Sequence, residues 1–161
     1  MARVGRDGYY TALVCPNGHV TTSMLELSPE NDQPHCSECG QGTIRECSAC
    51  GAEIHGSPGG EVIWGYDPPK YCHACGAPYP WTAAALAAGN ELAEILEGLS
   101  PADRKSLVAS FDDLTRDTPR TAVAVLRTKT LLGRLTREGA TALRQILVAV
   151  ATDEVKRQMG L

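Results

Sequence analysis

Four short cysteine-containing turns constrain the fold of this chain more than any other feature of its sequence. The first is a Cys-x3-His turn and the others are Cys-x2-Cys turns followed by glycine: Cys15/His19, Cys36/Cys39, Cys47/Cys50 and Cys72/Cys75. A Cys-x2-Cys turn places two sulfurs on one side of a tight loop, and glycine readily adopts the positive φ that such a loop needs. Seven cysteines and one histidine make eight donors, enough for two tetrahedral sites. Disulfides would leave one cysteine over, so the pattern predicts metal binding.

Two ways of pairing these turns are open. Sequential pairing gives a first site of Cys15, His19, Cys36 and Cys39 and a second site of Cys47, Cys50, Cys72 and Cys75, as in tandem zinc ribbons. A cross-braced pairing would join the first turn to the third and the second to the fourth, as in a RING-like ligase scaffold. The loops within the sequential pairs have 16 and 21 residues, long enough for self-contained hairpins, which favours sequential pairing. Zinc is the expected ion in both sites, and iron in the all-cysteine site stays open.

The three other histidines are weaker candidates for metal ligands. His35 and His73 each lie beside a ligand cysteine and could substitute for it. His55 is expected to be a strand or loop residue.

Short strands are expected around the turns. Tyr9–Val14 and Val20–Met24 flank the first turn, and Glu53–His55 and Glu61–Tyr66 flank the glycine-rich stretch 56–60. These patterns predict a tandem, or double, zinc ribbon of short antiparallel hairpins.

A shift in composition after Trp81 predicts a domain boundary. All cysteines and histidines precede this residue, and Phe111 is the only aromatic residue after it. We therefore expect a double zinc-ribbon domain over residues 1–80 and an α-helical domain over residues 81–161, which makes the chain an α+β protein.

Capping residues and apolar repeats predict about four helices in the second domain. The expected helices cover 83–97, a segment starting at Pro101, 119–132, and a last helix from about Thr136 or Gly139 to Met159. The apolar face of the last helix is expected to pack on the other helices or the ribbons, and an additional contact with another chain is the alternative.

Charge is divided unevenly between the two domains. Residues 1–80 carry four basic and nine acidic residues, a net charge of −5, and two metal sites with thiolate ligands would bring it to about −8. Such a surface repels phosphate backbones, which favours a protein partner or self-association over nucleic acid. Segment 120–144 is the exception, with six basic residues: Arg120, Arg127, Lys129, Arg134, Arg137 and Arg144. They are interpreted as a solvated face, and an anion, nucleic-acid or acidic-partner site is the alternative.

The sequence offers few groups for catalysis. The second domain has neither histidine nor cysteine, and the chain contains no phosphate-binding glycine loop. Sites with four protein ligands leave no position for a reactive water. We therefore expect a non-catalytic adaptor with two structural zinc ions. Residues 1–8 lack the apolar stretch of a secretory signal, and no apolar run is long enough for a bilayer, so a cytoplasmic location is expected.

The combined motifs resemble a known family. They are Gly8-Tyr9-Tyr10, Cys15-x-Asn17-Gly18-His19, the Cys36/Cys39 and Cys47/Cys50 turns, Tyr71-Cys72-His73-x-Cys75-Gly76-x-Pro78-Tyr79-Pro80-Trp81-Thr82 and Asp117-Thr118-Pro119-Arg120-Thr121. Together they are similar to a bacterial family that is catalogued only as a domain of unknown function. The resemblance implies that His19 and the seven cysteines are metal ligands, and it implies no activity.

Overall fold

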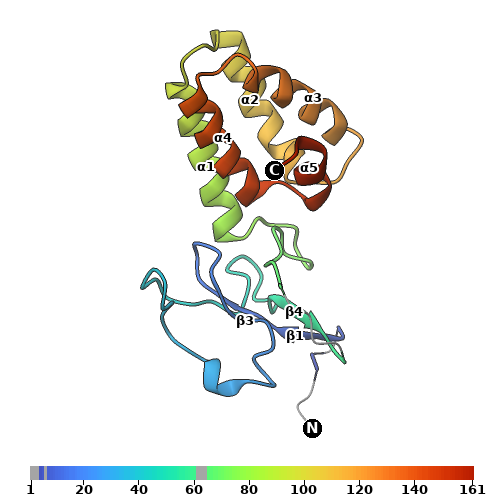
Figure 1. Ribbon diagram of the computed structural model, residues 1–161. Helices are drawn as coiled ribbons and strands as arrows, with labels where there is room; N and C mark the ends of the chain where they lie inside the picture. Colours follow the sequence, from blue (N-terminus) through green and yellow to red (C-terminus); the bar gives the residue numbers. More distant parts are fainter. Residues whose placement is uncertain (1–3, 6, 61–64) are drawn as a thin grey trace. The chain divides into compact units, whose positions relative to one another are not determined.

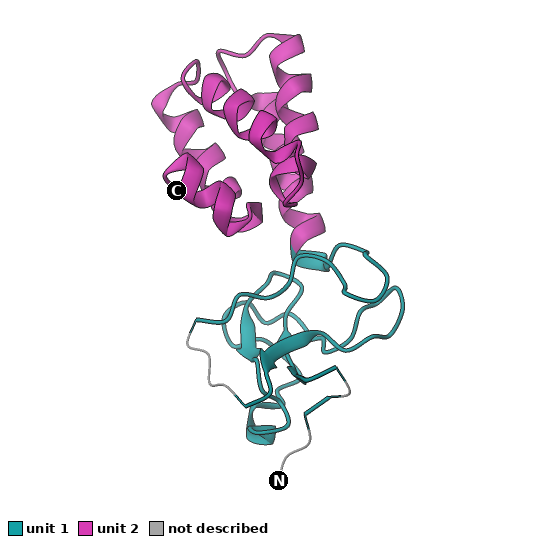
Figure 2. Ribbon diagram, turned by 90° about the vertical axis from the view of Figure 1, so that its right-hand side faces the viewer, with its two compact units in different colours: residues 1–81 teal, residues 82–161 magenta. Residues whose placement is uncertain are grey.

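The structure is a computed structural model that describes residues 4–5, 7–60 and 65–161. The chain divides into two compact units, Met1–Trp81 and Thr82–Leu161 (Figure 2). Short antiparallel strand pairs occupy the first unit and helices the second (Figure 1). The predicted α+β class, a tandem zinc ribbon followed by helices, is confirmed.

Among the described residues of the first unit, short strands form two antiparallel pairs. They are β1 (Tyr9–Thr11), β2 (Leu13–Val14), β3 (Val20–Thr22) and β4 (His55–Pro58), and a 3-10 turn covers Pro29–Asn31. Strand β1 pairs with β4, and β2 pairs with β3. The segment Tyr9–Val14, predicted as one strand, is therefore divided into β1 and β2, which pair with different strands. Between them, the backbone N–H of Ala12 donates to the carbonyl of Ile54 at 2.9 Å.

Strand β4 differs from the expectation for this part of the chain. It begins at His55 and continues through Gly56 and Ser57, where a turn was expected. The N–H of Ser57 donates to the carbonyl of Ser23 at 2.9 Å, and the register pairs Thr11 with His55, so backbone pairing holds this stretch extended. Of the predicted strand Glu61–Tyr66, residues 61–64 lie outside the described residues.

Among the described residues, the apolar core of the first unit includes cysteines. Its buried members are Ala12, Val14, Ile54 and Tyr79 together with Cys47 and Cys72. The Tyr79 ring stacks on the Trp81 indole, with centroids 4.7 Å apart, and the indole N–H donates to the carbonyl of Pro69.

Helices make up the second unit. They are α1 (Pro80–Ile95), which begins in the first unit, α2 (Pro101–Leu114), α3 (Thr121–Leu132), α4 (Arg137–Val150) and α5 (Asp153–Met159). The single helix predicted at the C-terminus is wrong, because the chain leaves helical geometry at Ala151 (ψ 150°). Thr152 then starts α5, and its side chain accepts a hydrogen bond from the N–H of Val155.

The core of the second unit lies between its helices. Leu107, Phe111 and Leu114 of α2 are buried in one cluster with Leu143 and Leu147 of α4. The apolar stripe of the last predicted helix therefore packs inside the chain. Among the described residues, no helix combines the length and apolar character needed to cross a membrane.

Candidate metal centres

The three Cys-x2-Cys turns share one backbone geometry. In each, the N–H of the glycine after the second cysteine donates to the carbonyl of the first cysteine, at 2.9, 2.8 and 2.8 Å. The three glycines have φ values of 72°, 75° and 72°, which residues with a side chain rarely adopt. The three turns therefore share one backbone conformation, which directs both cysteine sulfurs to the same side.

The first group of donors combines the Cys-x3-His turn between β2 and β3 with the second turn. The imidazole Nδ1 of His19 lies 3.4 Å from Cys15 Sγ and 3.6 Å from Cys36 Sγ, and Cys15 Sγ lies 3.7 Å from Cys39 Sγ. With metal–sulfur distances of about 2.3 Å and metal–nitrogen distances of about 2.0–2.1 Å, a tetrahedral site has S···S edges of about 3.8 Å and S···N edges of about 3.5 Å. A disulfide would need about 2.05 Å. The observed distances have the dimensions of a tetrahedral zinc site.

The second group combines the third and fourth turns. Cys47 Sγ lies 3.8 Å from Cys75 Sγ, and Cys50 Sγ lies 3.6 Å from Cys72 Sγ. These contacts also match the edges of a tetrahedron of four thiolates around zinc. Within each of the two groups, all donor atoms lie within 4.8 Å of one another, so each group is able to hold a metal ion.

The grouping is sequential. Neighbouring turns meet, whereas the cross-braced alternative required the Cys15/His19 turn to meet the Cys47/Cys50 turn, and these turns lie in separate groups. The first cysteine of each Cys-x2-Cys pair is buried, and the second is half-buried or exposed. Each pair thus has one sulfur at the core and one towards solvent.

In the first group, hydrogen bonds favour negative charge on the sulfur of Cys39. The backbone N–H of Gln41 and the side-chain amide of Asn17 lower the pKa of the Cys39 thiol to about 6. Asn17 Nδ2 lies 3.3 Å from Cys39 Sγ. On the outer side of His19, Nε2 lies 3.9 Å from a carboxylate oxygen of Glu38, a contact of the kind that orients ligand imidazoles.

Contacts between the sulfurs shift the thiol pKa values of the second group in opposite directions. Burial raises the pKa of the Cys72 thiol, but hydrogen bonds from the N–H groups of Cys75 and Ala74 and from the neighbouring cysteines lower that pKa to about 6. The N–H of Ala52 lowers the pKa of Cys50, yet its sulfur neighbours Cys75 and Cys72 help to raise it to about 12. Four thiolates at these distances therefore need a cation between them.

The structure places the remaining histidines apart from these groups. His35 pairs with Gly42 in an isolated β-bridge and belongs to none of the clusters of metal-ligating side chains found among the described residues. His73 does not replace a cysteine. It lies with His55 and Asp7 in a third cluster, which the sequence did not suggest because its members come from three segments.

The six basic residues of segment 120–144 do not form one stripe. Helix α3 ends at Leu132, so Arg134 lies beyond it and pairs with Asp103 at 2.9 Å. Arg120 pairs with Asp113 at 3.1 Å, and Arg127 Nη1 lies 3.4 Å from Ser110 Oγ. The other three, Lys129, Arg137 and Arg144, are exposed.

A comparison with known proteins places the chain in a family. No curated protein and no solved structure matches it. A family model described as an uncharacterized protein conserved in bacteria (DUF2321) matches residues 8–159, which confirms the resemblance inferred from the motifs. The chain therefore belongs to this family of uncharacterized proteins conserved in bacteria.

Proposed function

We propose that this protein is a non-catalytic zinc-binding protein in which two structural zinc ions stabilise a protein-interaction module. Cys15, His19, Cys36 and Cys39 hold the first ion, and Cys47, Cys50, Cys72 and Cys75 hold the second. The observation that carries the proposal is the set of donor-to-donor distances, from 3.4 to 3.8 Å, which have the size of tetrahedral edges around zinc.

A structural role fits the number of donors. A catalytic zinc keeps a position for water, whereas four protein donors fill a tetrahedral ion. The described core of the first unit also includes two of the cysteines, so metal binding there adds folding free energy to that of apolar burial.

The charge of the first unit supports a protein partner over nucleic acid. A net charge near −8 after metal binding repels phosphates. In the second unit, the ion pairs of Arg120 and Arg134 already occupy two of the six basic residues proposed for the alternative. In the nucleic-acid alternative, the exposed residues Lys129, Arg137 and Arg144 would make the main phosphate contacts.

Exposed apolar side chains suggest where contacts form. In the ribbon unit, Tyr9 is the aromatic candidate, with 39% of its surface exposed. On α3, Val123 and Leu126 are 55% and 67% exposed and lie three residues apart, so they are neighbours on one helix face. This small apolar patch supports contact with a protein, or self-association of the helical unit.

Metal analysis of the purified protein tests the structural part of the proposal. We expect two zinc ions per chain, and the Cys39→Ser variant is expected to lose one of them. Ser37→Ala alters the same turn without removing a donor, and it should keep both ions. Iron in place of zinc, fewer than two ions in the wild-type protein, or full zinc content in the Cys39→Ser variant would overturn the assignment.

A binding experiment separates the adaptor from the nucleic-acid alternative. Fluorescence anisotropy with labelled DNA and RNA at several salt concentrations should show no strong binding. Light scattering of a Val123→Glu/Leu126→Glu variant tests a separate point, namely whether the patch on α3 mediates self-association. Binding that weakens steeply with salt and is lost in an Arg137→Glu/Arg144→Glu variant would replace the adaptor by the nucleic-acid function.

A further inference from the structure

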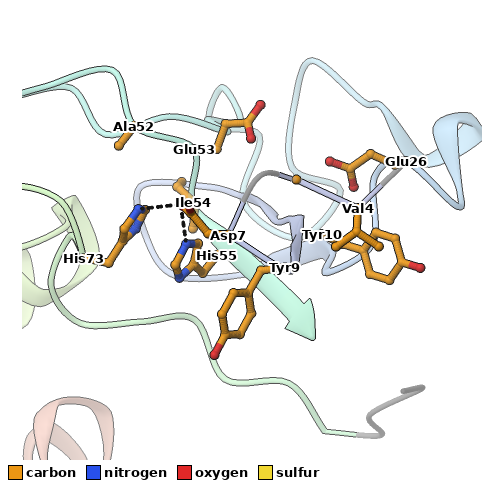
Figure 3. A pocket seen from close by; sticks show the side chains of 11 residues that line it. Val4, Asp7, Tyr9, Tyr10, Glu26, Ala52, Glu53, Ile54, His55 and His73 are labelled. Carbon is orange, nitrogen blue, oxygen red and sulfur yellow. Dashed lines mark ion pairs between the residues drawn. The ribbon is translucent and has the colours of Figure 1, made fainter. Parts of the chain in front are cut away.

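Asp7, His55 and His73 form a third cluster of metal-ligating side chains, outside the two cysteine groups. Asp7 precedes β1, His55 is the first residue of β4, and His73 lies between the cysteines of the fourth turn. One donor atom from each residue lies within 4.8 Å of the other two. In Figure 3, the two imidazoles both approach the Asp7 carboxylate, as the dashed lines mark.

The distances in this cluster are those of shared ligation rather than of hydrogen bonds. His55 Nε2 and His73 Nε2 each lie 3.6 Å from Asp7 Oδ2. An N–H···O hydrogen bond has a length of 2.7–3.2 Å, so both contacts are too long to be one. Nitrogen and oxygen donors about 2.0–2.2 Å from a tetrahedral ion are about 3.4 Å apart, close to the observed value.

His55 is held in place, and its donor atom is unused. Its Nε2 is buried and has no hydrogen-bond partner among the described residues. The Tyr9 ring stacks on the imidazole, with centroids 4.3 Å apart, and the pairing of β1 with β4 fixes both backbones. A buried nitrogen without a partner is unfavourable, and a bound cation would satisfy it.

His73 completes the cluster from a more exposed position than His55. Its ring stacks on His55 with centroids 3.6 Å apart and planes inclined by 13°. Nearly parallel rings direct their nitrogen lone pairs side by side, so ligation of one ion requires one ring to tilt. The side chain of His73 is 34% exposed, which leaves it room for this rotation.

The surroundings of the cluster favour a cation. All three residues line a cavity of about 550 Å³, which Glu26 and Glu53 also line (Figure 3). Glu26 accepts hydrogen bonds from the backbone N–H and hydroxyl of Thr11. The described lining residues include three carboxylates and no lysine or arginine, so the local potential attracts positive charge.

We propose that Asp7, His55 and His73 bind a third divalent transition-metal ion, such as zinc, in a site that remains open to an external ligand. Two imidazoles and a carboxylate suit first-row divalent ions, in contrast to the thiolate-rich groups. Three protein donors leave at least one coordination position, which water or a small molecule in the cavity can occupy. The site thus differs in chemistry from the two closed sites.

Zinc titration of the full chain, purified with its tightly bound ions, tests this proposal. Calorimetry should show one further equivalent of zinc, and Asp7→Asn and His73→Ala should each weaken its binding at least tenfold. His35→Ala is the matched control, because His35 also adjoins a cysteine of a metal group but lies outside the cluster. Retained tight zinc and unchanged tryptophan emission show that the variants are folded.

Histidine-selective ¹⁵N NMR identifies the ligands directly. On addition of zinc, the Nε2 resonances of His55 and His73 should shift, while those of His35 should not. The proposal is overturned if the wild-type chain takes up no further zinc, if the Asp7→Asn and His73→Ala variants bind the added ion as the wild type does, or if other histidines shift instead.

Discussion

At the scale of single residues, Gly56 shows how closely the backbones of the ribbon unit approach one another. A Cβ atom at this position would lie 2.1 Å from the Ser23 carbonyl oxygen and 2.8 Å from that of Tyr10. Both obstacles are backbone atoms of paired segments, so they cannot move aside as a flexible side chain would. Strand β4, which carries His55 at its start, therefore requires glycine here.

We predict that Gly56→Ala destabilises the first unit by about 3 kcal/mol, the upper end of the cost of overpacking. Both tryptophans of the chain, Trp64 and Trp81, lie in the first unit, so the thermal midpoint of their emission measures the effect. Gly42→Ala is the control, because the nearest atom to its Cβ would be 3.9 Å away. Equal midpoints for the two variants would contradict the prediction.

Residue-level reasoning found the cysteine groups because their chemistry is local. A Cys-x2-Cys turn specifies its own geometry, and the length of each loop pointed to the correct neighbour. The cluster of Asp7, His55 and His73 has no such signal. His55 meets Asp7 through the pairing of β1 with β4, and His73 joins them through the fold of the fourth turn, which no spacing along the chain reveals.

At the scale of elements, the start of α2 is a capping box tied to a distant arginine. Ser100 Oγ accepts a hydrogen bond from the N–H of Asp103, and the N–H and hydroxyl of Ser100 donate to the Asp103 carboxylate. The hydroxyl of Ser100, and then its backbone N–H and Arg134, lower the pKa of Asp103. The ionised carboxylate thus favours the folded helix.

This lowered pKa predicts a pH dependence for the helical unit. The stabilisation is complete above the unfolded pKa, about 3.9 for Asp, and is lost as the pH falls through that value towards the folded pKa. The midpoint of helix melting, followed by circular dichroism, should therefore fall between about pH 5 and pH 3. Asp103→Asn should flatten this fall, and Asp112→Asn, which alters an exposed carboxylate of the same helix, should not. A fall of equal size in the Asp103→Asn variant would contradict the role of this carboxylate.

The boundaries of the elements were harder to predict than their existence. The sequence predicted a helix from Pro101 after the Ser100 cap, and another from the apolar stripe of the last segment. The structure has helices in both places. The break at Ala151 was missed because the stripe continues to Val155, which is buried in the same core although it lies on α5. The chain thus ends α4 at Ala151 and begins α5 at the Thr152 cap without interrupting the apolar pattern, and periodicity alone does not show such a break.

At the scale of the whole molecule, the proposed zinc sites give the two units different sources of stability. The core of the second unit consists of aliphatic side chains and Phe111, whereas the core of the first unit includes Cys47 and Cys72. Under this proposal, removing metal weakens the core of the first unit and leaves the core of the second unit unchanged. We therefore predict that the two units respond differently to a chelator.

A strong chelator should unfold the first unit and leave the second one folded. Tryptophan emission, which comes only from residues 1–81, should shift to that of exposed indole, while the helical circular dichroism of residues 82–161 should largely persist. Added zinc should restore the emission, which separates metal loss from irreversible damage such as cysteine oxidation. Emission that stays native after complete metal removal would show that the ribbons fold without their ions. A loss of helical signal in step with the emission would show instead that the helical unit depends on the metallated ribbons, because its own core contains no metal-ligating side chain that a chelator could affect.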